Sequence, residues 1–155
     1  MARSVAEQIF NWIAMSTFEL KTHRIGKTYS NPHFFILNKG LNSGKPLSIP
    51  CPNCFVVTTS TEEEKNKLFY LSMMLQIGGF YTRYLKGSVI LFITIDDCRK
   101  TLKTRLKLYG NNEVKLAHDI NILSVISARE IELKNTVLEL EKLKISLIQT
   151  LFSRR

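Results

Sequence analysis

The longest regular pattern in the sequence is a helical one at its C-terminal end. Residues 111–155 contain no glycine and no proline, and apolar side chains recur there at spacings of three and four. Such spacing is typical of one continuous helix, which at about 1.5 Å per residue would be on the order of 60 Å long. A domain of this size cannot cover a helix of that length, so part of its apolar stripe needs a partner.

The same segment fits a seven-residue repeat. In a register that begins at Leu116 and takes alternate steps of three and four, eight of eleven core positions are apolar, and the exceptions are Asp119, Glu130 and Lys144. Repeats of this kind are typical of helices that associate along a common seam. We therefore expect assembly through one face of this helix, with the following residues on it: Leu133, Val137, Leu140, Leu147 and Leu151.

The apolar stripe is wider than a two-stranded seam requires. Leu138, Ile145, Ile148 and Phe152 extend it sideways, which favours docking on the protein's own sheet or in a multi-helix assembly. A helix packed within its own monomer and a homo-oligomer formed through the C-terminal helix remain alternative interpretations.

Residues 1–110 change period several times. The pattern predicts, in order, a helix over residues 4–16, strands over 17–23, 33–38 and 54–59, a helix over 60–77, a strand over 89–95 and a helix over 96–109. Glycine and proline mark residues 40–52 as a loop. The predicted fold class is α+β, with a small sheet of three or four strands, covering helices and a long C-terminal helix. Residues 1–110 form the basic globular domain and 111–155 the helix, within one structural unit.

Three of these predictions depend on specific local signals. Ser60 and Glu63 are spaced as a capping box at the start of the 60–77 helix. The run from Val89 to Ile95 is apolar almost throughout, which predicts a central strand covered on both faces. Gly110 is expected to end the 96–109 helix.

The charge balance is the unusual part of the composition. The chain has 22 Lys and Arg against 13 Asp and Glu, a formal charge of +9. Most of this excess lies in residues 1–110, whereas the C-terminal helix is nearly balanced. A basic body suits a polyanionic partner such as RNA, DNA or an acidic protein surface, although a merely basic soluble protein has the same composition.

One group of basic residues lies on the 96–109 helix. Apolar residues recur on one side of this helix, and the other side carries a cationic ridge: Arg99, Lys100, Lys103 and Lys107. Such a ridge could follow a phosphate backbone and release counterions from it. A solvated helix face is the alternative interpretation.

A second basic group surrounds the first two strands and their loop. It consists of Lys21, Arg24, Lys27, Lys39 and Lys45. Tyr29, His33, Phe34 and Phe35 lie among these cations, a mixture that single-stranded nucleic acid exploits through base stacking. Aromatic residues at strand spacing are usually core residues, so we expect Phe34 or Phe35 to face inward.

Two short motifs suggest other chemistry. The Gly40–Pro46 loop departs from a Walker A sequence, because only three residues separate its glycines and Pro46 follows Lys45. Cys51 and Cys54 are spaced as half of a zinc site, and no second cysteine pair exists, although His23 and His33 could supply ligands if the strands adjoin. Otherwise the sequence predicts no cofactor and, in the absence of a catalytic signature, no enzyme.

The sequence also bounds the compartment. Three cysteines without a secretory signal indicate a reducing environment, and the longest apolar run, Val89–Ile93, is far too short to span a bilayer. We expect a cytoplasmic protein without a membrane partner.

Several stretches resemble a small family of uncharacterised proteins carried by mobile elements and phages of Bacteroidetes-type bacteria. The resemblance covers about residues 18–100 and includes Asn31–Gly40, Asn42–Pro46 and Cys51–Phe55. It implies an accessory role, and one such role is inhibition of bacterial defence, as in anti-CRISPR proteins.

The functional hypothesis is a non-enzymatic accessory protein. Its basic surface would bind RNA, DNA or a host nucleoprotein complex, for example as an inhibitor of a CRISPR–Cas effector or of guide RNA loading. The alternatives are a protein-only adaptor that assembles through the C-terminal helix, and a zinc-binding protein with a single Cys51–Cys54 pair.

Overall fold

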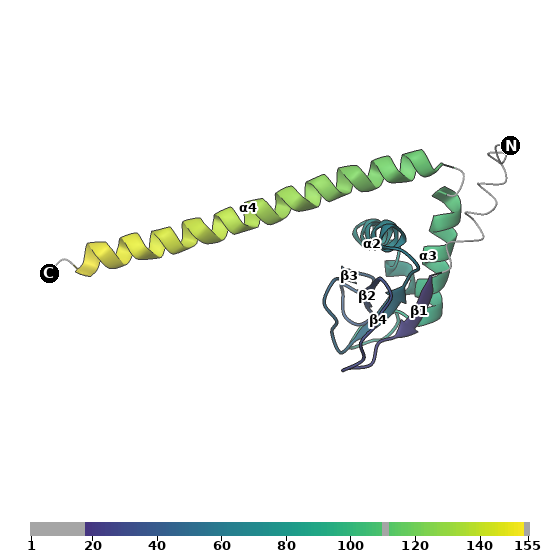
Figure 1. Ribbon diagram of the computed structural model, residues 1–155. Helices are drawn as coiled ribbons and strands as arrows, with labels where there is room; N and C mark the ends of the chain where they lie inside the picture. Colours follow the sequence, from purple (N-terminus) through teal and green to yellow (C-terminus); the bar gives the residue numbers. More distant parts are fainter. Residues whose placement is uncertain (1–17, 110–111, 154–155) are drawn as a thin grey trace. The chain divides into compact units, whose positions relative to one another are not determined.

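The computed structural model describes residues 18–109 and 112–153 (Figure 1). Its elements in order are β1 (Glu19–Thr22), β2 (His33–Leu37), β3 (Pro46–Leu47), β4 (Cys54–Thr58), α2 (Glu62–Ile77), the 3-10 turn η1 (Thr82–Tyr84), α3 (Ile95–Tyr109) and α4 (Glu113–Ser153). The chain divides into two compact parts after Ile120. We call the described residues up to Ile120 the body and residues 121–153 the arm. The helix predicted over residues 4–16 and the role of Gly110 lie outside the described residues.

The body is built on a four-stranded antiparallel sheet with the strand order β1-β4-β2-β3. Across the sheet, Leu20 of β1 lies opposite Val57 of β4, and Val57 lies opposite Phe34 of β2. β4 is the most deeply buried strand, and its residues from Cys54 to Val57 are buried on both faces. This architecture confirms the predicted α+β class.

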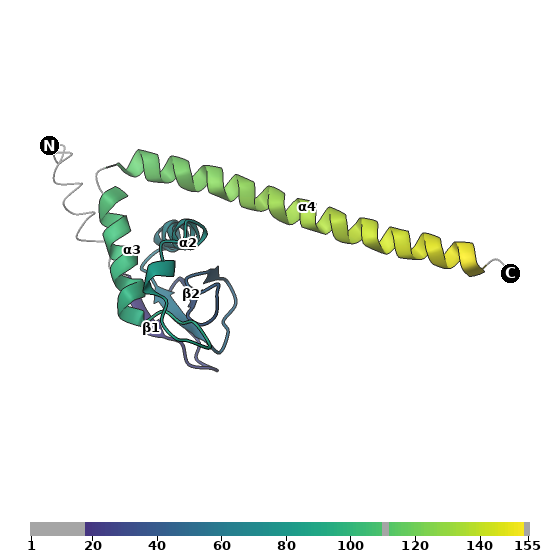
Figure 2. The same cartoon turned by 180° about the vertical axis from the view of Figure 1, so that it is seen from behind.

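Helices α2 and α3 pack on one face of the sheet and form the main core (Figure 1 and Figure 2). The strands contribute alternate side chains to this core because successive residues of a strand point to opposite faces. Each helix contributes residues spaced by three or four, which lie on one side of it. The buried residues of this core include Leu20, Phe34, Ile36, Phe55, Val57, Leu68, Leu71, Leu75, Tyr81, Ile93, Cys98, Leu102 and Leu106.

The opposite face of the sheet has a smaller core, in which strand residues pack against residues of the neighbouring loops and of β3. Phe35, Cys54 and Val56 are buried there, and Tyr29 and Leu47 pack against them. Phe34 and Phe35 are therefore both buried, one on each face. The sequence predicted that Phe34 or Phe35 faces inward. Phe34 lies in the main core, and Phe35 is buried in the smaller core on the other face.

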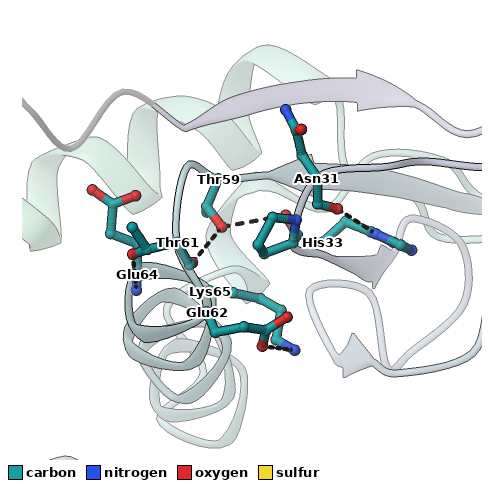
Figure 3. Close-up of polar contacts among 8 residues, drawn as sticks. Asn31, His33, Thr59, Thr61, Glu62, Glu64 and Lys65 are labelled. Atoms are coloured by element: carbon teal, nitrogen blue, oxygen red, sulfur yellow. Dashed lines mark hydrogen bonds and ion pairs between the residues drawn. The ribbon is translucent and has the colours of Figure 1, made fainter.

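The start of α2 is fixed by a capping box (Figure 3). The backbone N–H of Glu64 donates to the Thr61 hydroxyl at 3.2 Å, and the Glu64 carboxylate accepts from the backbone N–H of Ser60 at 3.1 Å. The Thr59 hydroxyl lies 3.0 Å from the Thr61 carbonyl and 3.2 Å from the Pro32 carbonyl, which joins α2 to the start of β2. The cap is one residue later than the predicted Ser60 position, since Thr61 has the extended backbone of an N-cap.

The strand predicted over residues 89–95 is absent from the described sheet, and that prediction was wrong. Val89 is 93% exposed, and the segment is a loop closed by paired backbone hydrogen bonds of 2.8 Å between Lys86 and Phe92. Gly87, with φ of +100°, makes the turn at its base. Of this segment, Ile93 is buried in the core and Ile95 packs partly buried against it. The fourth strand is instead the two-residue β3, which lies within the predicted 40–52 loop.

The loop between β2 and β3 packs closely against the core at Gly44. The N–H of Gly44 donates to the Leu37 carbonyl at 2.8 Å, and the N–H of Gly40 donates to the Leu91 carbonyl at 2.7 Å. Gly44 has φ of +94°, and the ring of Tyr81 occupies the space that a Cβ would need. This loop is thus anchored to β2, to the 86–93 loop and to the core.

Candidate functional site

The body contains a long stretch without any acidic residue. Between residues 20 and 61 there is no aspartate or glutamate, and the five cations of this stretch, Lys21, Arg24, Lys27, Lys39 and Lys45, are all exposed. Among the described residues, only Lys21 of these five forms a salt bridge, with Glu19 at 2.5 Å. The positive charge of the sheet and its loops is therefore largely uncompensated.

Four of these cations lie at the same end of the sheet. β1 and β2 end where β4 begins, because Thr22 pairs with Phe55 and Leu37 pairs with Cys54. Arg24 and Lys27 follow β1, and Lys39 and Lys45 follow β2. The antiparallel topology thus gathers side chains that are up to about 20 positions apart in sequence.

Lys86 joins this end of the sheet, although the sequence pattern did not single it out. Phe92 bridges to both Lys39 and Lys86, so the two lysines belong to neighbouring backbone segments. The Lys86 ammonium lies 3.2 Å from Asp97, which partly neutralises it. That carboxylate has a lowered pKa, chiefly through the Thr94 hydroxyl at 2.6 Å and then through Lys86. Lys86 is placed there by the backbone hydrogen bonds that close the 86–92 loop, and the hydrophobic pattern of the sequence does not predict these bonds.

A second cationic surface lies on α3. Lys100, Lys103 and Lys107 are exposed and spaced by three and four residues, so they form one row along the helix. Cys98 and Leu102 are buried on the other side of α3. No carboxylate of the described residues forms an ion pair with the three lysines of this row, which we call the α3 lysine row.

Arg99 has a structural role beside this row. Its Nη1 pairs with Asp96 at 2.6 Å and its Nη2 donates to the Leu20 carbonyl of β1 at 3.0 Å. The side chain is 35% exposed. Arg99 therefore attaches α3 to the edge strand that carries Lys21, and its guanidinium is already occupied by two protein acceptors.

The aromatic residues of this region form a cluster on the helix-free face. His23, Tyr29, His33 and Phe35 have ring centroids 5.0–6.2 Å apart in five pairings. Nδ1 of His23 lies 3.0 Å from the Tyr29 hydroxyl, and Lys27 lies 5.5 Å from the Tyr29 ring centre. Phe34 and Phe35 are buried and offer no ring to a base, which corrects that part of the stacking hypothesis. Tyr29 and His33, both half-buried, remain accessible.

Cys51 and Cys54 form the turn that leads into β4. The Cys54 thiol donates to the Cys51 carbonyl at 2.8 Å, and the Cys51 N–H lies 3.4 Å from Cys54 Sγ. Burial raises the pKa of Cys54 to about 11, so its thiol is protonated at neutral pH, whereas zinc binds thiolate. Among the described residues, no group of three or more histidine, cysteine or acidic side chains is placed to hold a metal ion. Zinc binding by this pair stays a prediction from the sequence.

The three cysteines should differ sharply in reactivity. Cys51 is half-exposed, whereas Cys54 and Cys98 are fully buried, and burial raises the pKa of Cys98 to about 12. We expect Ellman's reagent to titrate one thiol in the native protein and all three in guanidinium chloride. Rapid reaction of all three thiols in the native protein would contradict this core. A rise in the native count after chelation would instead indicate a bound metal.

An apolar groove of about 390 Å³ lies between α2, α3 and the first turns of α4 within the body. Its walls include Leu71, Met74 and Phe80, and Arg105 stacks on the Phe80 ring at 4.2 Å from the ring centre. The lining contains no carboxylate, histidine or cysteine. The groove thus offers none of the paired acid and base groups on which most hydrolytic sites depend.

Comparison with protein families gives a match over residues 20–150 to a family of unknown function. The chain belongs to the DUF6943 family. The matched region of this DUF6943 protein includes both cationic surfaces and α4 as far as residue 150. Comparisons with curated proteins and with solved structures gave no match. In the part of the DUF6943 chain that the structure describes, each helix is either too short or too polar to span a bilayer.

Proposed function

We propose that this protein binds nucleic acid without catalysing a reaction. The observation that carries the proposal is the uncompensated positive charge of the body: the acid-free stretch from residue 20 to 61 and the α3 lysine row. Exposed cations without carboxylate partners repel one another, and a polyanion relieves this repulsion. A phosphate backbone supplies regularly spaced negative charge and releases counterions when lysines neutralise it.

The α3 lysine row suits such a backbone in its dimensions. Lys100 and Lys107 are seven residues apart on a helix, which places them about 10 Å apart along its axis. A row of this length can contact a few consecutive phosphates, and it reads no base sequence. Tyr29 and His33, beside Lys27, add accessible rings that favour a single-stranded region over a regular duplex.

Removing two lysines of the row tests the proposal. The double variant Lys103→Ala/Lys107→Ala is expected to bind a labelled single-stranded RNA roughly tenfold more weakly at moderate salt. The slope of log K against log salt should also decrease by about 1 to 2, because two phosphate contacts are lost. Fluorescence anisotropy over a salt series measures both quantities.

A charge-matched variant provides the control. Lys65→Ala/Lys67→Ala also removes two positive charges from a helix of the body, but Lys65 pairs with Glu62 at 2.5 Å and Lys67 with Glu63 at 2.8 Å. We expect binding by this variant to change less than threefold at moderate salt. Equal losses in both variants would mean that only net charge matters, and no binding at low salt would refute the proposal.

The resemblance described above suggests the setting of this activity. We propose a cytoplasmic accessory protein of a mobile element that contacts an RNA or a nucleoprotein complex of its host, with inhibition of a CRISPR–Cas effector as one such role. Affinity purification from the host, with and without nuclease, would identify the bound RNA and protein. Loss of every partner after nuclease treatment is the expected result.

A protein-only adaptor is the second candidate. It is favoured by the exposed apolar residues of the arm. Deletion of residues 130–155 separates the two functions, because an adaptor would lose its partner while a nucleic-acid-binding body would retain RNA.

A further inference from the structure

The arm has an apolar face that a single helix cannot bury by itself. Five residues of the predicted repeat are each 55–65% exposed: Leu133, Val137, Leu140, Leu147 and Leu151. A second row, spaced by seven residues, runs beside them: Ile131, Leu138, Ile145 and Phe152. At 100° per residue the two rows and the strip between them span about 200°, a little more than half of the helix circumference.

Four charged residues lie inside this face. Glu130 and Lys144 occupy core positions of the first row, and Lys134 and Glu141 lie between the two apolar rows. Glu130 and Lys134 form an ion pair at 2.7 Å within the helix. Whatever covers the apolar rows must also place these charges against groups of opposite sign, because a desolvated charge without a partner is costly.

The four charges are arranged symmetrically about the middle of the arm. Glu130 and Lys144 lie seven residues before and after Val137, and Lys134 and Glu141 lie three before Val137 and three after Leu138. To within one residue, each charge thus has a counterpart of opposite sign at the same distance on the other side of Val137. This is the pattern that complements itself when the helix direction is reversed.

We propose that the arm pairs with the arm of a second copy of this chain in an antiparallel arrangement centred near Val137. In this arrangement Glu130 of each copy lies within about one turn of Lys144 of the other, and Lys134 lies within one turn of Glu141 of the other. Val137 and Leu140 face each other at the centre. The proposal concerns the arm alone and does not depend on nucleic-acid binding by the body.

A parallel, in-register pair would have the opposite electrostatics. Glu130 would face Glu130, Lys144 would face Lys144, and Arg129 would approach Lys134 of the second copy across the edge of the seam. All three contacts join like charges. Reversal of one helix converts the first two into attractive pairs and separates the third.

The bounds of the arm are consistent with an antiparallel pair centred near Val137. Val137 is the midpoint of residues 121–153, so two antiparallel arms overlap over nearly their whole length, about 45 Å. The points at which the two arms join Ile120 then lie at opposite ends of the pair. One two-fold axis thus covers the row that contains Leu133, Val137 and Leu147 and brings the charges into opposite pairs, while the second row borders the seam.

Charge exchange tests the arrangement in the full-length, nuclease-treated protein. Sedimentation equilibrium is expected to show a mass of two chains, and Glu130→Lys or Lys144→Glu alone should raise the dimer dissociation constant roughly tenfold. The double variant Glu130→Lys/Lys144→Glu restores opposite charges in the antiparallel pair. Its dissociation constant should return to within about threefold of the original value.

The control is Glu139→Lys, which makes the same charge change on the outer side of the helix and should leave the dissociation constant within about threefold. Circular dichroism verifies that each variant keeps its helix content. A monomer at high micromolar concentration would overturn the proposal. A dimer whose dissociation constant is unchanged by Glu130→Lys and by Lys144→Glu would also overturn it. In a parallel pair each of these residues faces its own copy, so a change of sign leaves the contact between like charges. Failure of the double variant to recover would also overturn it.

Discussion

Replacement of Gly44 by alanine is expected to lower the free energy of unfolding by about 3 kcal/mol or more, enough to unfold a marginally stable domain. Gly44 has φ of +94°, which a residue with a side chain adopts only under strain. Its Cβ would also lie 2.1 Å from Cδ2 of Tyr81, a residue that is only 2% exposed. Neither side can yield easily, because Gly44 is held to Leu37 and the ring is enclosed by the core. Denaturant unfolding followed by circular dichroism measures the loss.

Gly40→Ala separates strain from the clash. Gly40 has nearly the same φ, +92°, but no atom lies within 4 Å of the position a Cβ would take. Backbone strain alone should lower the free energy of unfolding of Gly40→Ala by about 1 kcal/mol. Equal losses in the two variants would show that the Tyr81 contact contributes nothing.

Leu102→Ala is expected to cost about 3 to 5 kcal/mol. Leu102 is fully buried and connects α3 with the core residues of the sheet and of α2. Its truncation removes buried apolar surface and leaves a cavity that a close-packed core fills only partly. The same unfolding measurement applies. The nucleic-acid binding that we propose should persist in the folded fraction, because the α3 lysine row remains exposed.

Leu108→Ala is the matched control on the same helix. Leu108 is 65% exposed, so its truncation should change the free energy of unfolding by less than about 0.5 kcal/mol. A loss comparable to that of Leu102→Ala would show that the face of α3 carrying Leu108 is covered in solution.

Most of the fold followed from local periodicity. Leu20 alternates with polar neighbours in β1, and Leu68, Leu71 and Leu75 recur at helical spacing in α2, so both elements were predicted with the right type. The prediction of a strand over residues 89–95 was wrong because the sequence pattern of a short apolar segment is the same whether the segment is buried or exposed. Here the backbone hydrogen bonds between Lys86 and Phe92 close the segment into a loop. β3 was not predicted because a strand of two residues is too short to show an alternation of apolar and polar positions.

The candidate site was only partly accessible from the sequence. The row of Lys100, Lys103 and Lys107 follows directly from helical spacing. The gathering of Arg24 and Lys39 at one end of the sheet depends on strand pairing between distant segments, which one sequence does not reveal. Arg99 was grouped with the binding residues, yet its contact with the Leu20 carbonyl is a tertiary one between positions 79 residues apart.

The two outer strands of the sheet have a consequence for solubility. β3 is two residues long and begins with Pro46, which has no N–H to offer, while in β1 the Leu20 carbonyl is taken by Arg99 and Lys21 projects a charge. Neither border of the described sheet is a flat template on which a further strand could dock. Growth into amyloid-like ribbons therefore has no starting edge in the described sheet, and the folded body should resist edge-to-edge aggregation at high protein concentration.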